Sequence, residues 1–244
     1  MKNIVTLFWK ETSLFFNSLI AYLTIMIFLI GVGLFFWVFQ NNVLEVGEAQ
    51  MDTLFSLAPW FFLFLIPAIT MRMFSEEFKT GTIEFLFTKP FSDWQIILGK
   101  YFASLVLVLF SILPTLLYYG TLYFYAEPMG NIDTGAIIGS YLGLFALGAI
   151  FAAIGIFSSS LTDNQIVAFI LGVFLSFTLY VGFDYLAELP LFASFSDFIA
   201  KLGINEHYRS ISRGVVDSRD VIYYFCVIFF FLFNTFLVLE TKRK

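Results

Sequence analysis

The chain has 244 residues, of which 60% are hydrophobic and only 13% are charged, and its formal net charge is −5. This composition excludes an ordinary soluble domain and predicts a membrane protein. An acidic chain without basic clusters between exposed aromatic residues also argues against a nucleic-acid partner.

Six windows of the chain contain no charged residue, and the shortest of them holds 19 residues. A helix needs roughly 20 apolar residues to cross about 30 Å of hydrocarbon, so each window is long enough to span once. The apolar runs are continuous, which favours helices over the alternating strands of a barrel. We therefore predict an all-α fold in one transmembrane domain, residues 1–244. The predicted spans are about 14–39, 53–72, 96–125, 134–160, 164–183 and 221–239.

The distribution of basic residues predicts that both termini are cytoplasmic. The first window follows charged residues and is too long for a signal-peptide core, so we expect it to remain as a membrane anchor. With the N-terminus inside, the short outer loops 40–52 and 127–133 carry no basic residue, as the positive-inside rule requires. The basic residues on the inner side are then Lys2, Lys10, Arg72, Lys79, Lys89, Lys100, Lys242, Arg243 and Lys244. We interpret the basic C-terminal tail as a stop-transfer anchor.

A charged, turn-rich stretch, FSEEFKTGTIEFLFTKPFSDWQIILGK, separates the second and third spans. Apolar and acidic residues alternate in it, and Gly81 with Thr82 interrupts the pattern. We expect two short helical pieces over about 74–88 that lie flat on the inner face. Pro90 should end the second piece, and Ser92 or Asp93 should cap the third span. Such an amphipathic element is suited to contact a soluble partner.

Small residues recur every four positions along the fourth span, first in a set of three and then, about one turn later, in a pair, and this spacing lets helix backbones approach closely. They are Gly135, Gly139, Gly143, Gly148 and Ala152. They predict a packing interface, either inside the bundle or against a second subunit.

The long segment 184–220 falls outside the membrane on the side opposite to the termini. Its apolar residues have near-helical spacing, which predicts short amphipathic helices resting at the outer interface. They would form a lid, a docking surface, or a cap without a binding role. The single histidine, His207, has no second ligand near it, so we predict no metal site. The single cysteine, Cys226, excludes a disulfide framework.

The charge-free windows also limit the function. Ion-coupled carriers need ionisable residues at membrane depth, and the chain has no phosphate-binding loop or catalytic constellation. We therefore predict that the chain is not an enzyme and has no catalytic residue. Energy for any movement of a substrate would have to come from outside this chain. A membrane-embedded enzyme is the weakest alternative.

The stretch between the second and third spans resembles the cytoplasmic segment of ABC-2 type transporter permeases. The matching residues are Glu76, Glu77, Gly81, Thr82, Ile83, Glu84, Phe85, Leu86, Pro90, Ser92, Asp93, Trp94, Gly99 and Lys100. Two further motifs, FFNSLIAYLTIMIFL and SRGVVDSRDVIYYF, look like the branch that contains the gliding-motility (GldF-like) and NosY-like permeases. Of these, the gliding-motility permeases are the most similar.

The resemblance implies a permease of the bacterial inner membrane that works with a dimer of a separate cytoplasmic ATPase. ATP and Mg would bind to that partner, and this chain would carry no cofactor. The resemblance also implies a second permease copy or a related membrane subunit, and an auxiliary membrane protein with a large outer domain. Export or envelope-directed work in gliding motility is the implied function. A NosY-like permease and a non-transporting mechanical module of the envelope are the alternatives.

The resemblance further assigns roles in the segment 74–88, which would act as the coupling helix that rests on the ATPase. Polar contacts would come from Glu76, Glu77 and Glu84, anchoring from Phe78, Phe85 and Leu86, and the bend from Gly81 with Thr82. Pro90, Asp93 and Trp94 would form the exit turn into the third span.

Overall fold

The computed structural model describes residues 2–40, 42–215 and 217–243, so Lys244 of the basic tail and Val216 of the second motif lie outside the described residues. Within these ranges the chain is helical and has no strand, which confirms the all-α prediction. The first half contains α1 (Lys2–Phe16), α2 (Leu19–Trp37), α3 (Val43–Val46), α4 (Asp52–Thr70), α5 (Arg72–Thr80), α6 (Thr82–Thr88), α7 (Asp93–Ile112), η1 (Leu113–Thr115) and α8 (Leu116–Tyr125). The second half contains α9 (Thr134–Leu161), α10 (Gln165–Phe177), η2 (Thr178–Gly182), α11 (Phe183–Glu188), η3 (Pro190–Phe195), α12 (Ser196–Ala200), α13 (Ile204–Ile211) and α14 (Ser218–Arg243).

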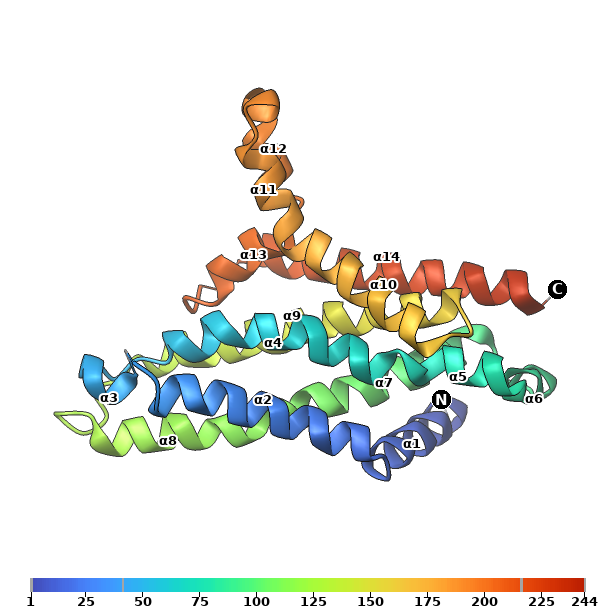
Figure 1. Ribbon diagram of the computed structural model, residues 1–244, viewed down its shortest axis with the longest axis horizontal. Helices are drawn as coiled ribbons and strands as arrows, with labels where there is room; N and C mark the ends of the chain where they lie inside the picture. The colour runs from blue at the N-terminus through green and yellow to red at the C-terminus, as the bar shows by residue number, and fades with distance from the viewer. Residues whose placement is uncertain (1, 41, 216, 244) are drawn as a thin grey trace.

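Six helical segments in the described part of the chain are long and apolar enough to cross a membrane, as predicted. They are Leu19–Trp37, Asp52–Thr80, Asp93–Tyr125, Thr134–Leu161, Gln165–Glu188 and Ser218–Arg243. Both chain ends lie at one end of the bundle together with α5 and α6, which we call the α6 end; α3 and the α8–α9 connection lie at the opposite end (Figure 1).

The first span begins at Leu19, which corrects the predicted start near residue 14. The side chain of Ser18 accepts a hydrogen bond from the amide of Ile20 and so starts a new helix at this point. The preceding residues form a separate helix, α1, which packs along α7. A β-carbon at Gly99 would lie 2.8 Å from Cβ of Leu7, so the glycine permits this close packing. The sequence pattern did not separate α1 from the first span, because the last turn of α1 is as apolar as the span that follows.

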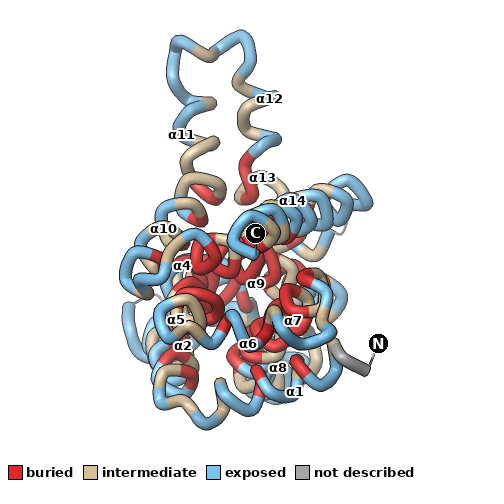
Figure 2. Tube along the Cα trace, turned by 90° about the vertical axis from the view of Figure 1, so that its right-hand side faces the viewer, coloured by how far each residue is buried: buried red, intermediate tan, exposed pale blue. Residues whose placement is uncertain are grey.

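The centre of the bundle is α9. In the span that contains α9, 72% of the most apolar window is buried, against 22% in α14 and 28% in α2. Figure 2 shows buried residues concentrated on α9, α4 and α7, whereas the outward sides of α10 and α14 are exposed. The exposed sides are apolar, as expected for surfaces that face lipid or another membrane subunit.

Most of the small residues on α9 pack against elements of the same chain. A β-carbon at Gly139 would lie 2.8 Å from Cα of Gly214, and one at Gly143 would lie 2.3 Å from Cγ2 of Ile211. Gly148 faces α7 and α4 in the same way, and Ala152 is fully buried. Gly135, in contrast, is exposed. The structure thus places four of the five small residues inside the bundle, not on a surface for a second subunit.

The fifth span continues through η2 and α11 and leads into a hairpin that stands away from the bundle (Figures 1 and 2). We call residues 183–200 the projecting hairpin. Its tip exposes Leu191 and Phe195, with 84% and 67% of their surface accessible. The expected helices are present, but they project from the bundle and do not lie against it. The base of the hairpin is held by Asp184, which accepts a hydrogen bond of 2.6 Å from Asn205 and lies 3.4 Å from Arg209.

Candidate functional site

The segment 74–88 consists of the end of α5 and the whole of α6, which meet at Gly81. Gly81 has φ +70° and ψ 4°, a left-handed conformation in which a side chain would be strained. Because nothing lies within 4 Å of a β-carbon built there, the backbone angle and not the available space favours glycine. The hydroxyls of Thr80 and Thr82 are 2.9 Å apart and close the bend on its exposed side.

Exposure divides the residues of α6 into two groups. Ile83 and Leu86 are buried against the bundle. Glu84 and Phe85 are exposed, with 72% of the surface of Phe85 accessible, and Phe85 also borders the cavity described below. A large aromatic side chain beside a carboxylate, both presented by a short fixed helix, is a suitable contact for another protein.

Glu76 is occupied by an ion pair on its own helix. The guanidinium of Arg72 donates to both carboxylate oxygens of Glu76, at 2.8 and 3.1 Å. The same guanidinium donates to the hydroxyl of Ser18 at 3.3 Å. Glu76 therefore helps to fasten α5 to the start of α2.

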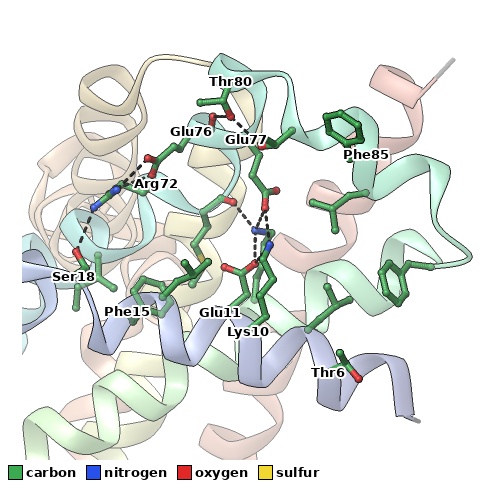
Figure 3. Close-up of a pocket in the computed structure, with 18 of the residues that line it drawn as sticks. Thr6, Lys10, Glu11, Phe15, Ser18, Arg72, Glu76, Glu77, Thr80 and Phe85 are labelled. Atoms are coloured by element: carbon green, nitrogen blue, oxygen red, sulfur yellow. Dashed lines mark hydrogen bonds and ion pairs between the residues drawn. The ribbon is translucent and has the colours of Figure 1, made fainter.

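Glu77 takes part in a buried charge cluster, which sets it apart from the surface contact that the resemblance implies. The ammonium of Lys100 donates to Glu77 at 2.8 Å, to Glu11 at 3.2 Å and to the carbonyl of Met73 at 2.7 Å. All three of its protons thus have acceptors, and the side chain is only 2% exposed. Lys10 lies 3.2 Å from Glu11 and 3.7 Å from Glu77, so two cations face two carboxylates (Figure 3). The cluster joins α1, α5 and α7.

The cluster stabilises the ionised form of the Glu11 carboxyl. Burial alone would raise the pKa of Glu11, but the ammonium groups of Lys100 and Lys10 outweigh it and hold this pKa below its ordinary value of 4.5. Glu11 and Lys100 are 89 residues apart, so no spacing in the sequence connects them. The only available signal was that both lie next to charge-free windows.

The C-terminal tail, predicted to be a stop-transfer anchor, also contacts the α5–α6 helix pair. The ammonium of Lys242 lies 3.7 Å from the ring centre of Phe78 and donates to the carbonyl of Ser160 at 3.0 Å. Arg243 forms an ion pair of 2.9 Å with Asp93 and donates to the carbonyl of Phe87 at 3.3 Å. These carbonyls belong to the last turns of α9 and α6, where cations are favoured. Phe78 is therefore an internal anchor.

The exit turn connects α6 to the start of α7. Pro90 lies in the exposed turn, and Ser92 caps α7 in a reciprocal arrangement with Gln95. Asp93 is buried in the ion pair with the tail. Trp94 stacks on Phe236 of α14, with ring centres 5.3 Å apart. The turn is thus fixed to the last span.

A cavity of about 660 Å³ lies between α1 and the α5–α6 pair, as drawn in Figure 3. Charged side chains of the cluster and of Arg72–Glu76 line one part, and apolar side chains such as Leu14 and Ile69 line another. No three potential metal ligands gather in the described part of the chain.

The fold and the site define a multi-pass α-helical membrane protein with a charged helix pair, bonded to the bundle, at the end where both ends of the chain lie. The profile of the ABC-2 family transporter protein family matches residues 41–203, about two thirds of the chain, and the chain belongs to this family. It is accordingly a membrane permease subunit of an ABC transporter. No curated protein matches the chain.

Proposed function

We propose that the α6 end is cytoplasmic and that α6 contacts a separate ATP-hydrolysing subunit through Glu84 and Phe85. The observation that carries the proposal is the exposure of Phe85 on a helix pair that is otherwise bonded into the bundle. A contact that transmits force needs an exposed anchor and a stiff attachment, and both are present here.

The attachment determines how motion would spread from this contact. Arg72–Glu76 joins α5 to α2, the Lys100 cluster joins α5 to α1 and α7, and the tail joins α6 and α7 to α14. Displacement of α6 by the ATPase would therefore act on several membrane helices together. In this proposal Glu76, Glu77, Phe78 and Leu86 hold the helix pair, and only Glu84 and Phe85 of the residues assigned to coupling meet the partner.

Our proposal for the process that this coupling drives is based on the resemblance of the sequence motifs and not on a substrate-binding site. We extend the proposal to export or envelope-directed work in the inner membrane of a bacterium, in gliding motility. A second permease copy or related subunit would cover the exposed apolar helices, and an auxiliary membrane protein with a large outer domain would meet the projecting hairpin. The alternatives are a NosY-like permease and a non-transporting mechanical module of the envelope. Both would use the same contact with the ATPase and would differ in what the membrane helices act on.

The proposed contact is tested by replacing Glu84 and Phe85 together with alanine and purifying the tagged chain in mild detergent. We expect the ATPase to be lost from the purified complex, because its aromatic anchor and the adjacent charge are both removed. Phe124→Ala is the matched control, since Phe124 is 68% exposed in α8, away from the α6 end. Retention of the ATPase by the double variant would contradict the assignment.

A further inference from the structure

His207 lies on α13 and joins two parts of the chain near the base of the projecting hairpin. Its Nδ1 is 2.7 Å from a carboxylate oxygen of Asp220 in the first turn of α14. Its Nε2 is 2.9 Å from the carbonyl oxygen of Lys201, directly after α12. Both ring nitrogens therefore face oxygen atoms that accept hydrogen bonds.

These two contacts determine how many protons the His207 ring and the Asp220 carboxyl hold together. A neutral imidazole has one N–H, and an ionised carboxylate and a backbone carbonyl have none to give. Two hydrogen bonds need two protons, so the His207–Asp220 pair holds one proton more than a neutral imidazole beside a carboxylate would. This count is the same whether the added proton is drawn on the ring or on Asp220.

The burial of Asp220 gives the added proton a structural role. Asp220 is only 6% exposed, and its second carboxylate oxygen has no hydrogen-bond partner. A buried carboxylate without a neighbouring cation is costly, so the proton on His207 offsets that cost. The ring of Tyr223 stacks on His207 with centres 3.9 Å apart, and the Tyr223 hydroxyl donates to the carbonyl of Leu202 at 2.6 Å.

The other charged groups near His207 either have partners or are exposed, whereas the buried hydroxyl of Tyr224 has no hydrogen-bond partner. The elements packed around His207 contribute Tyr224 of α14, Glu206 and Arg209 of α13, and Asp184 of α11. Arg209 pairs with Asp184, and the side chains of Glu206 and Lys201 are exposed. Asp220 is thus the carboxylate that meets the ring.

We propose that His207 is a proton-binding site that latches the returning leg of the projecting hairpin to α14. With the proton bound, the carbonyls of residues 201 and 202 are fastened to the first turn of α14 through His207 and Tyr223. Loss of the proton leaves one of the two His207 hydrogen bonds unmade and so breaks the link from Lys201 through His207 to Asp220, while the bond from Tyr223 to the carbonyl of Leu202 remains. The latch is closed while the proton is bound and opens when the proton is lost. This inference does not depend on the proposed ATPase contact.

The chain itself provides a clean measurement, because His207 is its only histidine. In protein labelled with ¹⁵N-histidine, every ring-nitrogen signal belongs to this side chain, and the chemical shifts report the proton count directly. We expect both nitrogens to be protonated at pH 5.5 in the full chain in nanodiscs. In Asp220→Asn, which lacks the carboxylate, the second proton should be lost at a lower pH than in the unaltered chain. Equal titration midpoints in the two proteins would overturn the proton-binding site.

Movement of the hairpin is measured separately, with spin labels at Ser194→Cys and Met129→Cys in a Cys226→Ser background. We expect the distribution of distances between the two labels to be narrow at pH 5.5 and broad at pH 8.5. The midpoint of this change should coincide with the midpoint of the ¹⁵N titration. His207→Gln should be broad at both pH values, because one amide cannot hold both acceptors. Lys201→Gln is the matched control, since its backbone carbonyl stays in place, and it should behave like the unaltered chain. A distribution that does not change with pH in the unaltered chain would overturn the latch.

Discussion

At the scale of single residues, Lys100 holds the α6 end together. Its ammonium is the shared partner of Glu77 and Glu11, and it is almost completely buried. Removing one member of a buried charge cluster leaves the others desolvated and uncompensated. The residue is therefore more important for stability than a lysine at the end of an apolar helix would suggest.

Lys100→Met keeps most of the side-chain volume but removes the charge. We expect it to lower the free energy of unfolding by about 3–5 kcal/mol, measured by denaturant unfolding in detergent, because two carboxylates lose their buried cation. Adding Glu11→Gln and Glu77→Gln should recover part of this loss. Lys89→Met, at an exposed position, is the control and should change stability little. A Lys100→Met protein as stable as the control would show that the cluster contributes nothing.

Glu11 gives the cluster a pH dependence whose sign follows from its lowered pKa. A carboxyl with a folded-state pKa below 4.5 stabilises the fold fully above about pH 4.5 and loses this contribution as the pH falls through the lower value. The difference in unfolding free energy between the unaltered chain and Glu11→Gln should therefore shrink on acidification below pH 4.5. The exposed Glu84→Gln serves as the reference. A difference that stayed constant down to pH 3 would contradict the role of Glu11.

At the scale of elements, the sequence predicted helices well and their contacts poorly. The charge-free windows located six spans because the bilayer sets a minimum length for each of them. The same windows concealed α1, since the break at Ser18 depends on one hydroxyl within an apolar run. The four-residue spacing on α9 predicted close packing, but only the structure shows that Gly139 meets Gly214 in the same chain. The contacts of Glu77 and of the basic tail could not be predicted, because their partners are remote in sequence.

The packing of α9 is tested by comparing two glycines on the same helix. Gly139→Ala should destabilise the fold by about 1–3 kcal/mol, because its methyl group would lie 2.8 Å from backbone that cannot yield cheaply. Gly135→Ala, whose nearest neighbour is the side chain of Asp133 at 3.5 Å, should be neutral or slightly stabilising. Thermal unfolding of both variants in detergent measures the difference. Equal effects would mean that the α9–α13 approach is looser than described.

At the scale of the whole molecule, the bundle has two distinct extremities. One is the α6 end, where α5, α6 and both ends of the chain lie; the other is the hairpin, which projects across the long axis (Figure 1). The positive-inside rule predicts that the α6 end is cytoplasmic and the hairpin is not. The hairpin's apolar tip was visible in the sequence as a helical pattern, but its direction away from the bundle was not.

Orientation is tested with single cysteines in a Cys226→Ser background. Lys89→Cys should resist an impermeant thiol reagent in intact cells and react after the cells are opened, whereas Ser194→Cys should react in both cases. Both positions are exposed, so protection by the fold does not explain a difference. The opposite pattern would reverse the topology and remove the α6 end from the ATPase.

The central claim is that Phe85 is the point at which the ATP-hydrolysing subunit meets this permease. The most direct measurement places a photo-crosslinking amino acid at position 85 in cells and identifies the adduct by mass spectrometry, with position 124 as the exposed aromatic control. We predict an adduct between position 85 and an ATP-binding subunit, and none from position 124. A complex that still contains the ATPase but gives no adduct from position 85 would contradict the claim.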